Sequence, residues 1–432
     1  MSEKRQPNGR RRFLAATALG LPGGLITARD LLVGRMPSLP EPAGTRPDEA
    51  YWRAVKRLYP LTPERTYLNT GGLGPAPWPV LDAFSRTTMD LARVSETGHR
   101  LIEEARERVA PFFGAHPDEI CFTRNATEGN SIIASGLDLR PGDEVLFDAH
   151  AHPGGSIPWL SRQKHGDVRV RLFEPDARSA DELLERIDSA LTSRTRVLQV
   201  SHVTAPTGIR LPVERIASMA RQRGIWFHID GAQSAGMFGI DLPAIGCDSW
   251  ATSGHKWMGA PHGTGILFIR KERLDDVRPT EVGAYSDSAY RLPDALEYVG
   301  TARRHESGTR NAALVKGVEE ACAFLEQIGM DAVEKRGREL TGRLRSLLAD
   351  LDRVEVLTPA AADLSGSMLT LRTEGLPYDE LNRHLGSVHR LRCRVVTERG
   401  LNAVRISMHV FNLLEDCERV AEGVIDALEK LG

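Results

Sequence analysis

A lysine in an unusual setting is the first candidate for chemistry. Lys256 follows His255 in the segment SGHKWMGAPHGTG (residues 253–265), directly after the apolar run SWATS (residues 249–253). A lysine that is removed from water loses its proton more easily and becomes a nucleophile for an aldehyde or ketone. Ser253 and His255 could donate hydrogen bonds to an anion beside it. Taken alone, the segment fits a structural lysine in a Gly-rich loop equally well.

An acidic residue ends a second apolar run. Asp230 is the last residue of IWFHID (residues 225–230), and Gln233 follows in GAQSAG. A carboxylate at this position can serve as a helix N-cap, but it can also pair with the protonated nitrogen of a pyridine ring. That pairing keeps the ring electron-withdrawing, and Gln233 could donate a hydrogen bond to a ring oxygen.

A third segment indicates a place for phosphate. TRNATEGN (residues 123–130) follows the apolar run EICFT (residues 119–123), and a helical pattern begins at Ala126. Helix N-termini carry free backbone N–H groups that favour an anion, and Thr127 adds a hydroxyl. A simple capped helix is the alternative interpretation. A phosphate cradle, an acid for a pyridinium and a lysine for an aldehyde together describe a site for pyridoxal 5′-phosphate (PLP).

The elements that must position these residues alternate in type. Short apolar runs predict buried strands, and helical patterns lie between several of them. This alternation is typical of a mostly parallel sheet covered on both faces, whose ligands bind beyond the carboxyl ends of the strands. The expected strands are residues 119–123, 144–148, 168–173, 196–201, 225–230, 249–253 and 265–270, with helices at 126–136, 180–191 and 212–222.

The pattern changes after residue 310 and predicts a second, smaller α+β domain. We expect helices at residues 311–328, 330–351 and 413–431, and weaker strands at 354–357, 368–372, 392–396 and 403–407. Upstream, we expect a helix over residues 48–59 with Asp48 as its N-cap, in a segment that packs back onto this domain. The predicted division is a signal segment (1–34), a linker and N-terminal segment (35–78), a large PLP-binding domain (79–310) and a small C-terminal domain (311–432).

The N-terminus resembles an export signal. Three arginines precede Phe13 and Leu14 in GRRRFLAATALGLPGGLITA (residues 9–28). The pattern Arg-Arg-x-Phe-Leu before a short apolar stretch is similar to a twin-arginine signal, which directs folded proteins to the periplasm. No cleavage site is evident, so an uncleaved membrane anchor and a disordered basic tail are the alternatives. We expect the twin-arginine export machinery to be a partner and the periplasm to be the location.

The composition narrows the class of partners. The 432 residues are 41% hydrophobic and 26% charged, and the formal net charge of -2 gives no argument for nucleic acid or an anionic membrane. The five cysteines are scattered without a CxxC pair, which argues against a disulfide framework and a zinc site of that kind. His150 and His152 are two residues apart, but no third ligand clearly joins them, so no metal is expected.

Together, the motifs resemble the class V aminotransferase family of fold type I, which includes cysteine desulfurases, kynureninase and isopenicillin N epimerase. The resemblance runs from about Tyr67 to the C-terminus and rests on NATEGN, HIDGAQSAG, SGHKW, the pair Gly308-Thr309 and VRISMHVFN. HVTAPTGIRLPV and YLNTGGLGPAP are most similar to the epimerase-like branch. The resemblance implies an α/β fold, with a large domain built on a mostly parallel seven-stranded sheet and a smaller α+β C-terminal domain.

The resemblance also implies a role in cofactor binding for each matching residue. Lys256 would hold PLP as a Schiff base and later move protons at the substrate Cα. Asp230 would pair with the pyridine nitrogen, and Gln233 would approach the 3-oxygen together with Thr204. The expected phosphate contacts are Ala126, Thr127, Ser253 and His255.

The remaining implied roles concern the ring, the substrate and a second subunit. His152 matches the position at which family members stack an aromatic ring on the cofactor, although His150 is the alternative. Arg405 would bind the substrate α-carboxylate through its planar fork, and Gly72 would also contact the substrate. Thr309 would reach the phosphate in the neighbouring protomer, so a homodimer is expected.

The expected activity is that of a PLP-dependent enzyme acting at the Cα of an amino acid through an external aldimine, as in epimerases and class V aminotransferases. A C–S lyase or a cysteine desulfurase-like elimination is one alternative, and a non-catalytic PLP-binding protein is another. Desulfurases carry a nucleophilic cysteine on a mobile loop. The candidate here, Cys393, lies in the strand-like run LRCRVV, where a buried thiol reacts poorly. The substrate and the fate of the Cα proton are left open.

Overall fold

The structure is a computed structural model that describes residues 39–41, 47–176 and 179–432. The expected signal segment, residues 1–34, lies outside these ranges, and export stays a prediction. Within them, no helix combines the length and the hydropathy that are needed to cross a bilayer. The predicted domain boundary at residue 310 also stays a prediction.

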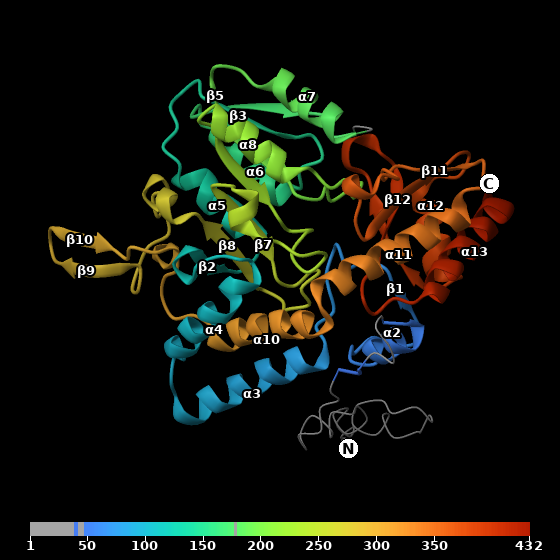
Figure 1. Cartoon of the computed structure of the whole chain (residues 1–432), viewed down its shortest axis with the longest axis horizontal. Coiled ribbons are helices and arrows are strands. Elements are labelled where there is room, and N and C mark those ends of the chain that lie inside the picture. Colours follow the sequence, from blue (N-terminus) through green and yellow to red (C-terminus); the bar gives the residue numbers. More distant parts are fainter. Residues whose placement is uncertain (1–38, 42–46, 177–178) are drawn as a thin grey trace, which may run out of the picture. The chain divides into compact units, whose positions relative to one another are not determined.

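The main sheet has the seven strands that the apolar runs predict, each within one residue of its expected bounds. They are β2 (Ile120–Thr123), β3 (Glu144–Asp148), β4 (Arg169–Phe173), β5 (Thr195–Ser201), β6 (Trp226–Asp230), β7 (Ser249–Ser253) and β8 (Gly265–Ile269). Their order is β2-β8-β7-β6-β5-β3-β4. Several of these strands, among them β2, β7 and β8, are labelled in Figure 1. Only the pairs that involve β8 are antiparallel, so the expectation of a mostly parallel sheet is confirmed.

Helices bury both faces of this sheet. Along β8, Ile266 and Phe268 belong to one apolar core, while Leu267 and Ile269 belong to another, because successive side chains point to opposite faces. The second core receives α5 (Ala126–Gly136) and α6 (Pro153–Lys164). The first receives α4 (His99–Phe112), α7 (Ala180–Ala190), α8 (Val213–Gln222) and α10 (Ala312–Ile328), with α3 (Trp78–Val94) and the short α9 (Leu242–Ile245).

The strand directions gather the chemical residues at one edge of the sheet. β2 is antiparallel to β8, and β8 is antiparallel to β7, so β2 points the same way as β6 and β7. Asp230 and Ser253 end their strands at this edge, and α5 begins there directly after β2. This is the carboxyl edge of the sheet, where parallel sheets bind their ligands and where we expected the site to lie.

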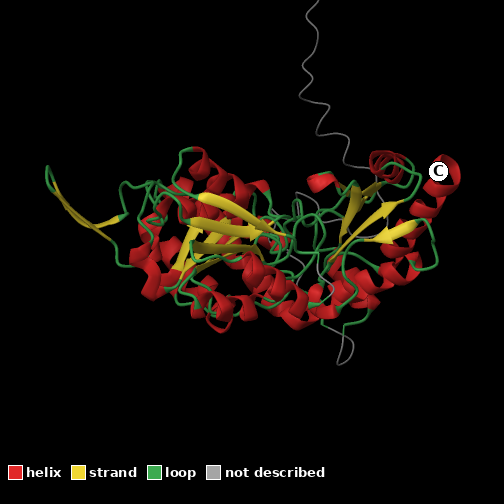
Figure 2. Ribbon diagram, turned by 90° about the horizontal axis from the view of Figure 1, so that it is seen from above, coloured by secondary structure: helices red, strands yellow, loops and turns green. Residues whose placement is uncertain are grey.

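A smaller antiparallel sheet follows in the chain. Its order is β11 (Val354–Val356), β12 (Met368–Thr373), β15 (Ala403–Ser407) and β14 (Arg394–Val396). Figure 2 shows the two groups of strands with helices around each. The apolar core of the smaller sheet includes side chains from α11 (Met330–Leu348), α12 (Tyr378–Ser387) and α13 (Leu414–Leu431). The α/β fold with a smaller C-terminal antiparallel part agrees with the prediction.

One expected strand is divided. The run over residues 392–396 changes its partner at Cys393, because Leu391–Arg392 (β13) pairs in parallel with Thr66–Tyr67 (β1), whereas β14 pairs with β15. The prediction of one continuous strand over residues 392–396 was therefore wrong. The division has a consequence for the site, since it sets Arg394 beside Arg405 in the register of β14 and β15.

The N-terminal segment packs onto the smaller part, as predicted. In α2 (Glu49–Lys56), Asp48 is the N-cap and accepts a hydrogen bond from the Tyr51 N–H at 2.8 Å. Arg53 forms an ion pair with Glu415 at the start of α13, with 3.1 Å between the charged atoms. Together with the β1–β13 pairing, these contacts join residues more than 300 positions apart in the chain.

The structure contains a β-hairpin that projects from the main domain and that the sequence patterns did not predict. Its strands, β9 (Asp287–Arg291) and β10 (Ala295–Tyr298), extend away from the main sheet in both views (Figures 1 and 2). The hairpin exposes large apolar side chains, including Tyr290 and Leu292. It was missed because its residues show little of the apolar alternation that marks a half-buried strand.

Candidate active site

The carboxyl edge of the main sheet borders a cavity of about 260 Å³. Its walls come from the strand ends, from the N-terminus of α5, from the segment before α3 and from the small sheet. They include all the expected site residues except Thr204 and Thr309. Asn130 and Arg394 also line the cavity, although the sequence patterns did not single them out as site residues.

Lys256 is a half-buried side chain of this cavity. Burial lowers the pKa of its ammonium to about 8; Arg405 and Arg394 lower it further, whereas Asp230 opposes the shift. The backbone beside it is closely approached by Gly74, whose N–H donates to the His255 carbonyl at 2.8 Å. A Cβ at position 74 would lie 1.7 Å from the Lys256 carbonyl oxygen, so only glycine fits there.

Asp230 is a buried carboxylate that neutral groups hold in place. Its Oδ2 accepts a hydrogen bond from Asn130 Nδ2 at 2.9 Å, and its Oδ1 accepts one from the Ala232 N–H at 3.0 Å. Asn130 is itself fixed by His228, with 2.8 Å between Oδ1 and Nε2. Among the residues that the structure describes, no cation forms an ion pair with Asp230. The carboxylate is therefore oriented and ready to pair with a cationic N–H of a ligand.

The helix α5 N-terminus is only partly free, which corrects the expectation of an open set of N–H groups. The Ala126 N–H donates to Ser253 Oγ at 3.0 Å, and the Glu128 N–H donates to the Asn125 side chain at 2.9 Å. What remains for an anion is the Thr127 N–H with its hydroxyl, together with the Ser253 hydroxyl hydrogen. These groups still form a small anion site at the positive end of a helix dipole.

Two histidines complete this side of the cavity. His255 Nδ1 lies 3.1 Å from the Thr264 carbonyl and donates to it, so its Nε2 can donate to a phosphate only when the ring is protonated. Burial, helped by Lys256, lowers the pKa of His255, and a bound anion would oppose that shift. His152 lines the cavity, whereas His150 is buried outside it against the Thr207 hydroxyl at 3.1 Å. The geometry therefore favours His152 over His150 for stacking.

Arg405 is a buried guanidinium for which the described residues supply no acidic partner. Its Nη1 donates to the Ala205 carbonyl at 2.6 Å and its Nη2 to Asn69 Oδ1 at 3.0 Å, while Nε has no partner. In the described part of the chain Arg405 forms no ion pair. Burial, and to a smaller extent the nearby charge of Arg394, lowers the pKa of its guanidinium to about 9. A buried charge of this kind is costly unless a ligand supplies the opposite charge.

Arg394 stands beside Arg405 on the neighbouring strand. Its guanidinium forms an ion pair with Glu398, but its Nη1 is buried without a hydrogen-bond partner. Two adjacent guanidiniums make this end of the cavity strongly positive. Only the register of β14 on β15 shows the pair, because the two arginines are eleven positions apart in the chain.

Of the remaining expected residues, Gln233 and Gly72 line the cavity, whereas Thr204 does not. Gln233 lines the cavity, with its Oε1 accepting from Trp257 Nε1 and its Nε2 donating to the Gly71 carbonyl, each at 2.8 Å. Gly72 also lines it, and a Cβ there would lie 2.5 Å from Asn69 Nδ2. Thr204 is not among the lining residues, and its hydroxyl is used by Thr207 and by the Ile209 N–H. The geometry gives no support to a Thr204 contact with a ring oxygen.

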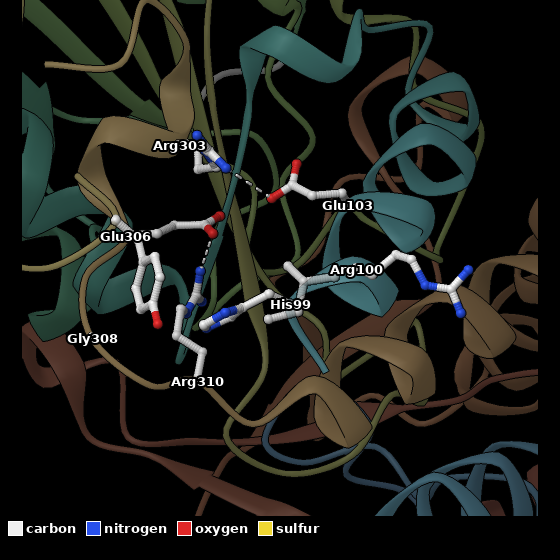
Figure 3. A pocket seen from close by; sticks show the side chains of 9 residues that line it. His99, Arg100, Glu103, Arg303, Glu306, Gly308 and Arg310 are labelled. Atoms are coloured by element: carbon white, nitrogen blue, oxygen red, sulfur yellow. Dashed lines mark ion pairs between the residues drawn. The ribbon is translucent and has the colours of Figure 1, made fainter. Parts of the chain in front are cut away.

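Thr309 lies exposed on another part of the surface, away from Lys256. Its neighbours Gly308 and Arg310 line a second cavity, shown in Figure 3. There Arg310 pairs with Glu306, and Arg303 lies 3.5 Å from Glu103. The expected contact of Thr309 with a neighbouring protomer stays a prediction.

The donor set of the Lys256 cavity fits PLP. An amine of lowered pKa suits the aldehyde, the uncompensated Asp230 suits a pyridinium, and the α5 N-terminus suits a phosphate. Close glycine packing shapes the space: a Cβ at Gly154 would lie 2.3 Å from Thr127 Oγ1, and one at Gly155 would lie 2.8 Å from Asp230 Oδ2. The cavity thus offers a negative carboxylate for the pyridinium and hydrogen-bond donors at a helix N-terminus for the phosphate.

Comparisons with known proteins identify a family and a shared fold. The profile of the family described as Aminotransferase class-V matches residues 82–420. Isopenicillin N epimerase of Amycolatopsis lactamdurans is 32% identical over 86% of this chain and 98% of its own. The apo structure of a cysteine desulfurase from Thermococcus onnurineus NA1 superposes with a TM-score of 0.79 at 26% identity, covering 87% of this chain and 98% of that one. A C-DES variant with glycine covalently linked to its PLP cofactor has the same fold, with a TM-score of 0.78, at 24% identity over 86% and 99% of the two chains.

Proposed function

This chain belongs to the class V aminotransferase family of PLP-dependent enzymes, and we propose that it binds PLP and removes and returns the proton at the Cα of an amino acid, as an epimerase does. The similarity to isopenicillin N epimerase over nearly its full length supports this choice of reaction. Relatives called probable cysteine desulfurases are also similar, so the reaction must be argued from the site.

The observation that carries the proposal is the buried, unpaired Arg405 in the same cavity as Lys256. A guanidinium fork binds a carboxylate through two parallel hydrogen bonds. A substrate α-carboxylate would supply the negative charge that the described residues do not. Because the α-carboxylate is attached directly to Cα, this contact would also bring the Cα–H bond into the region of Lys256.

The chain's own residues then account for proton transfer. When bound, PLP withdraws electrons from Cα of the attached amino acid and so acidifies its hydrogen. Lys256, with a pKa near 8, can take that proton as a neutral amine and return it as an ammonium. Asp230 would balance the positive charge on the ring nitrogen, and Arg405 would keep the carboxylate from rotating away. Epimerisation results when a proton reaches the face of Cα opposite to the one from which Lys256 removed it, which requires a second proton donor on that face or a turn of the substrate within the cavity.

The cysteines argue against persulfide transfer. All five are free and buried. Burial raises the pKa of every one, to about 12 for Cys393 and Cys417, so none is a thiolate near neutral pH. A desulfurase that stores sulfur on its own cysteine needs a reactive, accessible thiolate, which this chain lacks. An elimination that releases sulfur directly would not need one and is an alternative outcome of the experiment below.

The test is incubation of the PLP-loaded protein in D₂O with a panel of L- and D-amino acids and cysteine conjugates. Exchange of the Cα hydrogen for deuterium with inversion, and without formation of a keto acid, pyruvate or sulfide, is the expected result. A keto acid would show transamination, and pyruvate with sulfide would show elimination; either would overturn the proposed reaction. Lys256→Ala should abolish exchange, whereas Cys393→Ala should leave it unchanged.

A further inference from the structure

We propose that a divalent transition-metal cation binds between α12 and α13, held by His384, His389 and Asp426. The Nε2 atoms of the two histidines lie 2.7 and 3.0 Å from Asp426 Oδ2. One potential ligand atom from each of the three side chains lies within 4.8 Å of the others. The two helices pack against each other beside the smaller sheet (Figure 1), and none of the three side chains lines the cavity of Lys256.

The backbone brings these side chains together from three places. His384 lies in the last turn of α12, His389 lies two residues past its end, and Asp426 lies on α13. Gly423, almost one turn before Asp426, makes the approach possible. A Cβ at position 423 would lie 3.2 Å from Cγ of His389 and 2.8 Å from Leu385. The missing side chain lets the imidazole lie against α13 and turn its Nε2 toward the carboxylate.

The donor set is the one that zinc and its first-row neighbours prefer. Two imidazole nitrogens and a carboxylate oxygen bind Zn²⁺ at about 2.0–2.2 Å, with tetrahedral geometry. Ligand atoms around such an ion lie roughly 3.3 Å apart. The two contacts between Nε2 and Oδ2, at 2.7 and 3.0 Å, would open by about half an ångström or less, and the two Nε2 atoms, which lie within 4.8 Å of each other, would adjust to the same separation. The side chains of His389 and Asp426 are each 23% exposed, which leaves room for water as a fourth ligand. Both rings would bind as neutral imidazoles with the proton on Nδ1.

The ammonium of Lys430 opposes a bound cation. Lys430 Nζ lies 2.6 Å from Asp426 Oδ1, one helical turn along α13. The ammonium therefore uses the carboxylate oxygen that does not face the histidines, and Oδ2 stays directed at them. The positive charge of Lys430 lowers the affinity of the site for a cation, but its ammonium does not occupy the ligand atom Oδ2. This arrangement makes Lys430 a useful probe, because its removal should strengthen binding.

The position of the site implies that the metal is structural. Arg419 of α13 donates from Nη2 to the His389 carbonyl at 3.0 Å, so the same short segment is already anchored to α13 through its backbone. The chain then continues through β13 into β14, which carries Arg394. A metal would join the end of α12 to α13 at the base of this segment and stabilise the packing of the smaller sheet.

The test is calorimetric titration of the PLP-loaded, full-length protein with Zn²⁺ after treatment with a chelator. The wild type should bind one equivalent more than His389→Ala or His384→Ala, whose affinity at this site should fall by at least about tenfold. Lys430→Met should bind more tightly than the wild type. His165→Ala, which removes an exposed histidine after α6, is the matched control and should bind as the wild type does.

Two results would overturn the proposal. One is equal stoichiometry and affinity in the wild type and in His389→Ala. The other is a lack of binding at this site in both the wild type and Lys430→Met. Circular dichroism and the Cα exchange rate show whether each variant is folded, and His389 is the preferred position because its ring is partly exposed and its loss leaves the helix core intact.

Discussion

The nucleophile of the site is prepared by its surroundings. Burial and two arginines lower the pKa of Lys256 to about 8, so the ammonium predominates below that pH and the free amine above it. Because only the free amine attacks an aldehyde, the rate at which the apoprotein forms its coloured adduct with PLP should rise with pH to about 8 and then level off. Absorbance measured from about pH 6 to about pH 10 tests this. Lys256→Ala should form no adduct, and a rate that does not change over this range would contradict the prediction.

The fork of Arg405 is the second residue-scale feature. Arg405→Lys keeps the charge but loses the planar pair of donors, so it should weaken substrate binding by about 1.5–3 kcal/mol, or roughly tenfold to a hundredfold. Spectral titration of the PLP-loaded protein with its substrate measures this. Arg372→Lys, at an exposed ion pair with Glu355 on the same sheet, is the control. An equal effect of both substitutions would exclude a direct contact between Arg405 and the carboxylate.

At the scale of elements, the close approach of α6 to the strand ends shapes the ring-binding part of the cavity. A Cβ at Gly155 would lie 2.8 Å from Asp230 Oδ2, so Gly155→Ala should displace the carboxylate and weaken PLP binding by about 1–3 kcal/mol. Cofactor dissociation, followed by absorbance, measures the effect. Gly342→Ala in α11 has open space at its Cβ and should instead leave PLP binding unchanged and stabilise the helix by up to about 1 kcal/mol. Unchanged PLP binding in Gly155→Ala would contradict the packing argument.

Most elements of the main sheet follow from local patterns. Buried strands such as β6 are continuous apolar runs, and α5 begins at Ala126 because the Asn125 side chain caps the helix. The division of residues 392–396 into β13 and β14 does not follow, since β13 is held by β1, more than 300 positions earlier in the chain, whereas β14 pairs with the nearby β15. The hairpin of β9 and β10 lacks a buried face and therefore lacks a hydrophobic pattern.

At the scale of the whole molecule, we propose that the folded protein is exported with its cofactor through the twin-arginine machinery. The support is the Arg-Arg-x-Phe-Leu pattern at residues 10–14 and the general use of this route for folded proteins. Fractionation of cells should place the wild type in the periplasm and the double variant Arg10→Lys, Arg11→Lys in the cytosol, with equal Cα exchange activity. A wild type that stays in the cytosol with residues 1–28 retained would contradict the proposal.

The sequence by itself determined which residues stand at strand ends. Lys256, Asp230 and the start of α5 are placed there by the apolar runs just before them, and hydrophobic burial of those runs is a local property. The tertiary structure alone decided which residues become neighbours. It placed Arg394 beside Arg405 and set His152, not His150, in the cavity wall. It also brought His384 of one helix to Asp426 of another. Such contacts depend on strand register and helix packing, which are set by the folded chain as a whole and not by the local run of residues.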